Sequence, residues 1–176
     1  MKYKKISKKF ETFFVFAQIK DHVTLWLSRK EVAMNNVSYF KKVSVKESVN
    51  NWTESIIVAA TPLLEAGCIT DNYVNAMIDN VKNNGSYIVI MPHVALPHSR
   101  AEMGVMKTGV SILKLDQPVM YPDDKSVKLI IAFSANDNNQ HMELLSVLAE
   151  VLMDESRLKE ILNANDTNEI ENLFFN

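Results

Sequence analysis

Two histidines in the segment MPHVALPHSR, His93 and His98, and a third at position 141 are the side chains best suited to group transfer. A neutral imidazole can attack a phosphoryl group, and its ordinary pKa near 6.5 keeps it largely neutral at cellular pH. Pro97 fixes the backbone just before His98 and restricts Leu96, so the ring is held in a defined place. His98 is therefore a candidate nucleophile, and a loop histidine with one structural hydrogen bond is the alternative.

His141 follows the polar run SANDNNQ and falls in the first turn of a helix expected over residues 140–153. The free N–H groups at a helix N-terminus favour an anion. A histidine there could donate to a phosphate oxygen, and an ordinary exposed helix residue is the alternative. His98 and His141 follow the apolar segments 86–91 and 127–135. They would meet at one rim if those two strands were neighbours in the sheet.

The segments that must position these histidines alternate between extended and helical patterns. Extended patterns predict an edge strand, a buried apolar strand and two further strands, at 36–46, 86–91, 109–115 and 127–135, with turn chemistry over 116–126. Helical stripes lie over 51–66, 70–84 and 140–153, then from Ser156, and the tail ends in a helical turn. This order predicts an α/β fold, a three-layer sandwich in which a mixed sheet carries helices on both faces.

The chain length of 176 residues fits one domain with a short appendage. Residues 1–46 hold 11 Lys/Arg and 3 Asp/Glu, whereas residues 47–176 hold 8 and 18. We expect a basic N-terminal extension over residues 1–35 and one domain over residues 36–176. A basic arm can contact nucleic acid or anionic lipid. Scattered aromatic residues in a helix-forming lead-in favour neither, so no nucleic-acid partner is expected.

The single cysteine, Cys68, allows no intramolecular disulfide and fits a reducing compartment. No apolar run approaches the roughly 20 residues that span a bilayer. The apolar stretch 13–17 is too short for a signal peptide, and no small-residue cleavage site follows it. We therefore expect a cytoplasmic protein.

A zinc site built from His93, His98 and His141 is the rival chemical interpretation, because three histidines can hold zinc. No HExxH pattern or cysteine–carboxylate cluster accompanies these histidines, and a rigid proline separates two of them. The sequence also lacks a glycine-rich phosphate loop and a serine nucleophile elbow. We expect neither a metal nor a cofactor.

Three segments together resemble a known family. VALPHSRAEMGVMKTGVSILKLDQPV resembles the active-site stretch of type-2 IIA components of the bacterial sugar phosphotransferase system, the mannitol/fructose superfamily, and matches its ascorbate-type members most closely. FSANDNNQHMELLSVLAEVL resembles the second histidine signature of that family, and NNWTESIIVAATPLLEAGCITDNYVNAMIDNV its opening helix pair. The resemblance covers about residues 37–165 and implies the mannitol/fructose IIA fold.

The resemblance implies a relay. His98 would accept a phosphoryl group from the phosphohistidine of the carrier HPr and pass it to a IIB partner. That partner serves a membrane IIC transporter for a sugar; an ascorbate-type substrate is one possibility, and the sequence does not identify the sugar. His141 would stabilise the phosphorylated state. Ser99 could donate a hydroxyl or backbone N–H to the phosphate, or fill a turn.

Two departures from the family pattern concern charged or bulky side chains. His93 stands where the family carries a small residue such as glycine, and it could crowd the site, join it or point away. Mannitol-type members place an arginine before the reactive histidine, where this chain has Lys82. Arg100 is the nearest guanidinium and could contact the phosphate, or it could lie exposed on the surface.

A different functional class shares the same domain. In a IIA-like domain at the C-terminus of a transcription regulator, phosphorylation serves as a signal and is not passed on to a sugar. Residues 1–35 could be the remnant of such an attachment. The absence of a DNA-binding domain and the presence of both histidines favour the relay. An edge strand or the aromatic N-terminal segment could also pair two copies of the chain, so a homodimer is one expectation.

Overall fold

The structure, a computed structural model, describes residues 39–175. The basic extension expected over residues 1–35 and the first three residues of the strand expected at 36–46 lie outside the described residues. The described elements are β1 (Phe40–Lys46), α2 (Trp52–Glu65), α3 (Asp71–Asn84), β2 (Val89–Met91), β3 (His93–Ala95), a 3₁₀ turn (Ala101–Met103), β4 (Gly109–Tyr121), β5 (Lys125–Ser134), α4 (Asn138–Met153), α5 (Glu155–Asn163) and α6 (Thr167–Phe175).

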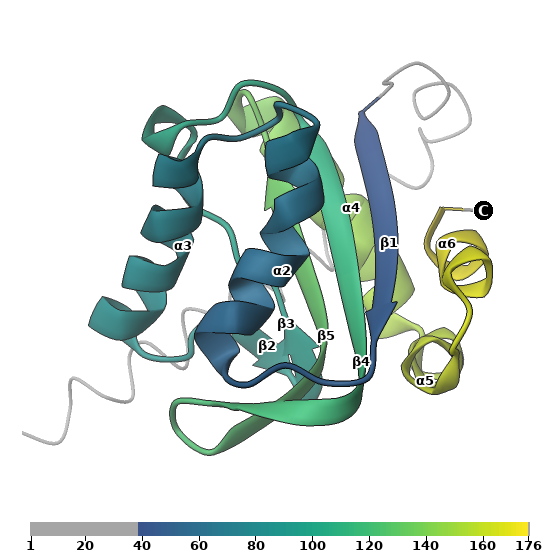
Figure 1. Ribbon diagram of the computed structural model, residues 1–176. Coiled ribbons are helices and arrows are strands. Elements are labelled where there is room, and N and C mark those ends of the chain that lie inside the picture. Colours follow the sequence, from purple (N-terminus) through teal and green to yellow (C-terminus); the bar gives the residue numbers. More distant parts are fainter. Residues whose placement is uncertain (1–38, 176) are drawn as a thin grey trace, which may run out of the picture. The chain divides into compact units, whose positions relative to one another are not determined.

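The five strands form one mixed sheet in the order β1-β4-β5-β3-β2 (Figure 1). β1 runs parallel to β4, and β3 runs parallel to β5. The β4–β5 and β2–β3 pairs are antiparallel. The strand expected over 36–46 lies at one edge, as predicted, and it begins at Phe40 among the described residues.

Helices cover both faces of this sheet because each strand alternates its apolar side chains between two cores. α2 and α3 pack on one face, together with Ile130 and Ala132 of β5. α4, α5 and α6 pack on the other face, together with Ile131 and Phe133 of the same strand (Figure 1). The predicted fold class, a three-layer α/β sandwich, is confirmed.

The helices begin and end at the signals that the sequence contains. The side chain of Asn51 accepts a hydrogen bond from the backbone N–H of Glu54 at 2.9 Å, which caps α2. Asp137 caps α4 in the same way, by accepting from the backbone N–H of Gln140 at 2.9 Å. Gly67 and Gly85 follow α2 and α3 with positive φ values of 64° and 76°. Glycine adopts this left-handed backbone without steric cost.

The segment 86–91 differs from the single buried strand that its apolar pattern predicts. Only Val89–Met91 forms a strand, and it is a half-buried edge strand. The chain then turns at Pro92 and returns as β3, because His93 adopts a positive φ of 69° that allows the reversal. The strand next to β5 is therefore β3, which the sequence pattern did not reveal, and not residues 86–91.

β4 is longer than the strand expected over 109–115, and most of the expected turn over 116–126 belongs to the β4–β5 hairpin. The strand continues through Pro118 because the pairing with β5 shifts register between Lys114 and Val119. A proline, which has no N–H, is tolerated at such a bulge. The actual turn is confined to residues 122–124, where Asp123 and Asp124 have positive φ values.

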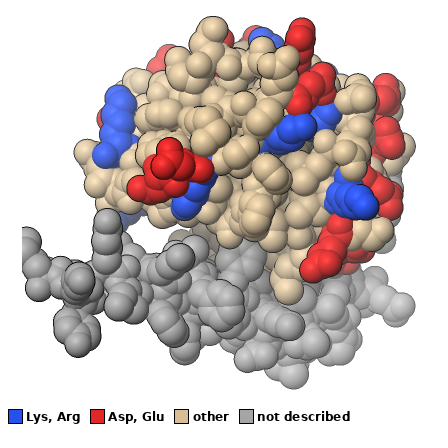
Figure 2. Space-filling model, turned by 90° about the horizontal axis from the view of Figure 1, so that it is seen from below, with Lys and Arg blue, Asp and Glu red and all other residues tan. Residues whose placement is uncertain are grey.

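Figure 2 shows the molecule from below the view of Figure 1. On the described part of this face, Lys and Arg side chains lie beside Asp and Glu side chains instead of gathering in patches of one sign. Within residues 39–175, none of the helices combines the length and the apolar character needed to cross a bilayer.

Candidate functional site

His98 lies just beyond the end of β3, and the sheet topology explains why it is there. β3 and β5 are parallel, so their carboxyl ends lie at the same edge of the sheet. Leu96 and Pro97 continue β3 as buried residues, and the half-buried His98 follows them. Its imidazole stacks on the ring of Phe133, with the centroids 4.9 Å apart and the planes inclined by 24°.

His141 reaches the same place from α4. This helix begins directly after β5, and His141 lies in its first turn, where its backbone N–H donates to Asp137 O at 3.0 Å. The ring centroid of His141 is 5.6 Å from that of His98 and 5.3 Å from that of Phe133. The structure therefore brings together the two histidines that the sequence singled out, and it adds a phenylalanine whose ring contacts both.

The hydrogen bond of His98 selects its tautomer. Its Nδ1 lies 2.9 Å from the backbone oxygen of Leu96. Because a carbonyl oxygen only accepts hydrogen bonds, Nδ1 must carry the proton, and the lone pair of the neutral ring is on Nε2. Burial lowers the pKa of His98, an effect that the Leu96 hydrogen bond opposes and His141 reinforces. The ring is therefore neutral and nucleophilic at cellular pH.

His141 is half-buried, and burial lowers its pKa as well. A neutral imidazole still carries one N–H, so His141 can donate one hydrogen bond without a positive charge. Two neutral rings side by side avoid the repulsion that two imidazolium ions would experience. The pair is thus one nucleophile and one donor at the amino end of a helix, where an anion is favoured.

Two side chains of α3 hold the backbone that follows His98. The hydroxyl of Tyr73 accepts a hydrogen bond from Ser99 N at 3.0 Å and lies within donating distance of Ser99 O at 3.1 Å and Phe133 O at 3.0 Å. Asn80 Nδ2 lies 3.4 Å from His98 O and from Ser99 Oγ. The loop that carries the candidate nucleophile is therefore hydrogen-bonded to α3, and the Tyr73 hydroxyl also bonds to the end of β5.

The other candidate residues are placed differently. Ser99 is half-buried beside His98, with its backbone N–H occupied by Tyr73. Arg100 is exposed in the loop after Ser99. His93 is exposed at the start of β3 and pairs with Val127, six residues before Phe133 on β5, so it lies at the other end of this strand pair from the ring cluster. The three histidines therefore do not converge on one metal site.

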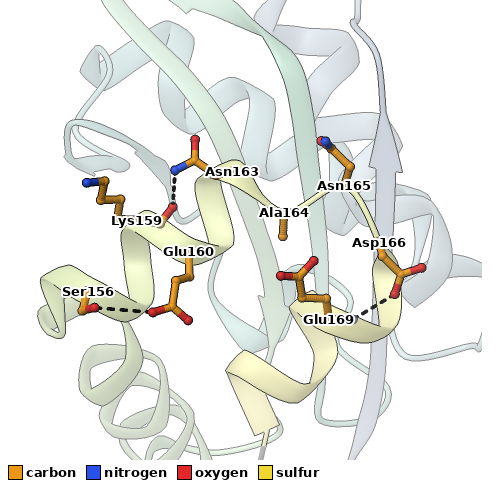
Figure 3. A pocket seen from close by; sticks show the side chains of 8 residues that line it. All are labelled: Ser156, Lys159, Glu160, Asn163, Ala164, Asn165, Asp166 and Glu169. Atoms are coloured by element: carbon orange, nitrogen blue, oxygen red, sulfur yellow. Dashed lines mark hydrogen bonds between the residues drawn. The ribbon is translucent and has the colours of Figure 1, made fainter.

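A hollow in the described surface lies elsewhere, between α5 and α6 (Figure 3). Two of its carboxylates already have partners, since Glu160 accepts from the Ser156 hydroxyl and Asp166 accepts from Glu169 N. Across residues 39–175, no group of three or more His, Cys, Asp or Glu side chains is placed to hold a metal ion. The hollow is separate from the two histidines.

Sequence reasoning missed Tyr73, Phe133 and the Leu96 carbonyl. Tyr73 belongs to the apolar stripe of α3, and Phe133 to an apolar strand, so both have the pattern of core residues. Both are in fact buried, and each adds a polar or stacking contact to the site. The one available signal for Tyr73 is its hydroxyl, because a fully buried tyrosine needs a hydrogen-bond partner.

Known proteins resemble this chain over most of its length. A family model described as the phosphoenolpyruvate-dependent sugar phosphotransferase system, EIIA 2, matches residues 38–176. The mannitol-specific cryptic phosphotransferase enzyme IIA component of Escherichia coli K12 is 36% identical over 132 residues, covering 74% of this chain and 90% of that protein. An ascorbate-specific EIIA component of Salmonella choleraesuis is 33% identical over 118 residues, covering 66% and 73%.

Solved structures agree with these sequence matches. The solution structure of the E. coli cryptic mannitol IIA component superposes with a TM-score of 0.69 at 33% identity, covering 78% of this chain and 92% of that one. The complex of E. coli IIA mannitol with phosphorylated IIB mannitol superposes with a TM-score of 0.63 at 26% identity, covering 76% and 92%.

Proposed function

Because the chain belongs to the EIIA 2 family of the phosphoenolpyruvate-dependent sugar phosphotransferase system, we propose that it is a phosphoryl carrier whose phosphate acceptor is His98. The observation that carries the proposal is the neutral His98 ring with Nδ1 bonded to Leu96 O and with His141 beside it. Phosphoryl transfer needs little from the protein beyond a placed nucleophile and stabilisation of the spread negative charge.

In the accepting step, the lone pair of Nε2 attacks the phosphorus of a phosphohistidine on HPr. The new Nε2–P bond forms as the phosphorus–nitrogen bond on the carrier breaks, and the carrier imidazole leaves with the electron pair. Nδ1 of His98 keeps its proton, so the phosphorylated ring carries a delocalised positive charge. The hydrogen bond to Leu96 O stabilises that charge, and the reverse sequence passes the group onward.

His141 would stabilise the phosphoryl group in both directions. Its ring lies edge-on to that of His98, and its N–H can point toward an oxygen of a group bonded to Nε2. A neutral donor lowers the energy of the transferring group without binding the product as tightly as a cation would. This balance suits a relay that must release what it accepts. Ser99 and the exposed Arg100 are secondary candidates for contact with the phosphoryl oxygens.

The partners follow from the relay. A relative of this chain forms a complex with a phosphorylated IIB protein, which supports IIB as the acceptor here. We propose HPr as the donor and a membrane IIC transporter behind IIB. The relatives include mannitol-specific and ascorbate-specific components, which supports a sugar or sugar acid as the transported compound without identifying it. The alternative of a regulatory module gains no support from these relatives, whose names are those of sugar phosphotransferase components.

A labelling experiment tests the proposal. The chain is incubated with phosphorylated HPr, kept at alkaline pH because phosphohistidine is acid-labile, and examined by mass spectrometry and ³¹P NMR. We expect one phosphoryl group on Nε2 of His98, which leaves when a cognate IIB domain is added. Label on another residue would exclude His98, and label that no IIB protein removes would favour the regulatory alternative.

A further inference from the structure

We propose that Tyr73 is a positioning residue for His98, because its hydroxyl ties the residue after the nucleophile to the residue on which the nucleophile's ring stacks. The inference rests on the proposed role of His98 as phosphoryl acceptor. Tyr73 is only 1% exposed. A buried side chain of this kind does not touch HPr or IIB, so any effect on the reaction must pass through His98.

The geometry of the link is specific. The Tyr73 hydroxyl accepts from Ser99 N at 3.0 Å, and its single proton can go to Ser99 O at 3.1 Å or to Phe133 O at 3.0 Å. Ser99 shares a peptide bond with His98, and the ring of Phe133 stacks against the His98 ring. One oxygen atom on α3 therefore joins the loop after β3 to the end of β5, directly behind the imidazole.

The other hydrogen bonds near His98 do not connect its loop to α3 as closely as the Tyr73 hydroxyl does. The Leu96 hydrogen bond fixes which nitrogen of His98 carries the proton, but both of its atoms lie on the same short loop. Asn80, two helical turns after Tyr73 on α3, reaches the same loop only at the long distance of 3.4 Å. The hydrogen bond between the Tyr73 hydroxyl and Ser99 N is thus shorter than those that Asn80 makes to the same loop.

The link should hold through the working range of pH. Burial raises the pKa of Tyr73 to about 12, although the hydrogen bond with Ser99 opposes this. The hydroxyl therefore keeps its proton throughout the range between pH 5 and 8 in which phosphorylation is measured. A placement error of about 1 Å in a reacting group can reduce a rate by around 10²-fold. We expect loss of the Tyr73 hydroxyl to let the His98 ring shift by a distance of that order.

Tyr73→Phe is the direct test, because it removes the hydroxyl and keeps the ring that fills the core. Tyr121→Phe is the matched control, since Tyr121 is also buried and its hydroxyl bonds to Ser55 at 2.7 Å, away from the two histidines. Single-turnover phosphorylation is measured over a range of phosphorylated HPr concentrations. We expect the limiting rate of Tyr73→Phe to fall roughly 10- to 100-fold, with an unchanged half-saturating concentration, while Tyr121→Phe keeps the wild-type rate.

Two further measurements separate positioning from general destabilisation. ¹H NMR of the His98 ring should show the ring-current shift expected from stacking on Phe133 in the wild-type protein and in Tyr121→Phe, and a smaller shift in Tyr73→Phe. Hydrogen exchange on the wild-type protein needs no variant: the Ser99 amide should be protected in spite of its position in a loop. An unprotected Ser99 amide would overturn the inference, even if Tyr73→Phe failed to fold.

The outcomes also separate this inference from the proposed function. If wild-type His98 accepts phosphate and Tyr73→Phe accepts it at the wild-type rate, Tyr73 has no positioning role. Equal slowing of Tyr73→Phe and Tyr121→Phe would assign the effect to lost stability and would also overturn it. If wild-type His98 accepts no phosphate, the proposed function fails, and the ring-shift and exchange measurements still decide whether Tyr73 holds the loop.

Discussion

The rings of His98 and His141 lie with their centroids 5.6 Å apart and their planes inclined by 60°, although one follows β3 and the other belongs to α4. Their meeting follows from the parallel pairing of β3 with β5, because α4 starts where β5 ends. A group bonded to one ring is then within reach of the other. This relationship leads to separate predictions for the two side chains.

His98→Ala should accept no phosphate from phosphorylated HPr, because no other imidazole in the described site has a free lone pair held in place. His93→Ala is the control: it removes an exposed histidine at the opposite end of β3 from His98. It should be labelled at the wild-type rate. Acid-labile phosphate is counted by intact-protein mass spectrometry, and residual labelling of His98→Ala would disprove the assignment.

His141→Ala should fold and still accept phosphate, but more slowly. Loss of one hydrogen-bond donor to a developing negative charge typically reduces a rate by about 10²-fold. His141→Gln retains an N–H and should recover part of that rate. The check is single-turnover transfer in both directions, with thermal unfolding to show that the fold is retained. Phosphoryl transfer at the wild-type rate in His141→Ala would show that His141 does not stabilise the phosphoryl group.

Much of the fold was accessible from sequence because its signals are local. Asn51 and Asp137 cap helices through side-chain hydrogen bonds to residues three positions ahead. A spacing this short can be recognised in the sequence itself. β5 is a long apolar run and was placed within two residues of its observed bounds. The β2–β3 turn has no comparable signal, since each strand has three residues and the reversal depends on a positive φ at His93.

The candidate site divides in the same way. His98 and His141 were found because Pro97 and a polar cap precede them, and these are features of neighbouring residues. Tyr73 contacts Ser99 across 26 residues of sequence, and its place in the apolar stripe of α3 conceals the use of its hydroxyl. Contacts of this kind depend on how the layers pack, which one sequence does not specify.

Ser111→Ala should stabilise the protein. Ser111 is 1% exposed in β4, and its hydroxyl has no hydrogen-bond partner within the described part of the chain. A buried hydroxyl without a partner costs about 1–3 kcal/mol, so we expect its removal to raise the free energy of unfolding by about 1 kcal/mol after the small void is counted. Urea unfolding measures this change.

Ser55→Ala is the matched control for that prediction. Ser55 is also fully buried, but its hydroxyl donates to Trp52 O at 2.7 Å and bonds to the Tyr121 hydroxyl at 2.7 Å. Its removal leaves a buried tyrosine hydroxyl unpaired and should lower the free energy of unfolding by roughly 1–3 kcal/mol. Equal destabilisation by both substitutions would show that Ser111 has a partner within the folded protein.

The pH dependence of phosphorylation should report the lowered pKa of His98. Protonation of Nε2 removes the attacking lone pair, so the rate should still exceed half its maximum at pH 6.5 and reach its midpoint at a lower pH. Single-turnover rates between pH 5 and 8 measure this, with His141→Gln to remove the second titrating ring. A half-maximal rate at or above pH 6.5 would show that burial does not lower the pKa of His98.

The same pKa shift makes the free energy of unfolding depend on pH, and the direction of the shift determines the direction of that change. Because the folded pKa of His98 lies below the unfolded value of about 6.5, the unfolded chain binds more protons between those two values. His98 therefore makes stability fall as pH decreases from about 6.5 to the folded pKa, and it adds no slope above that window. His98→Gln should show a smaller loss of unfolding free energy over this window in urea titrations. An identical slope in the two proteins would mean that His98 titrates alike in both states, contrary to its packing between Phe133 and His141.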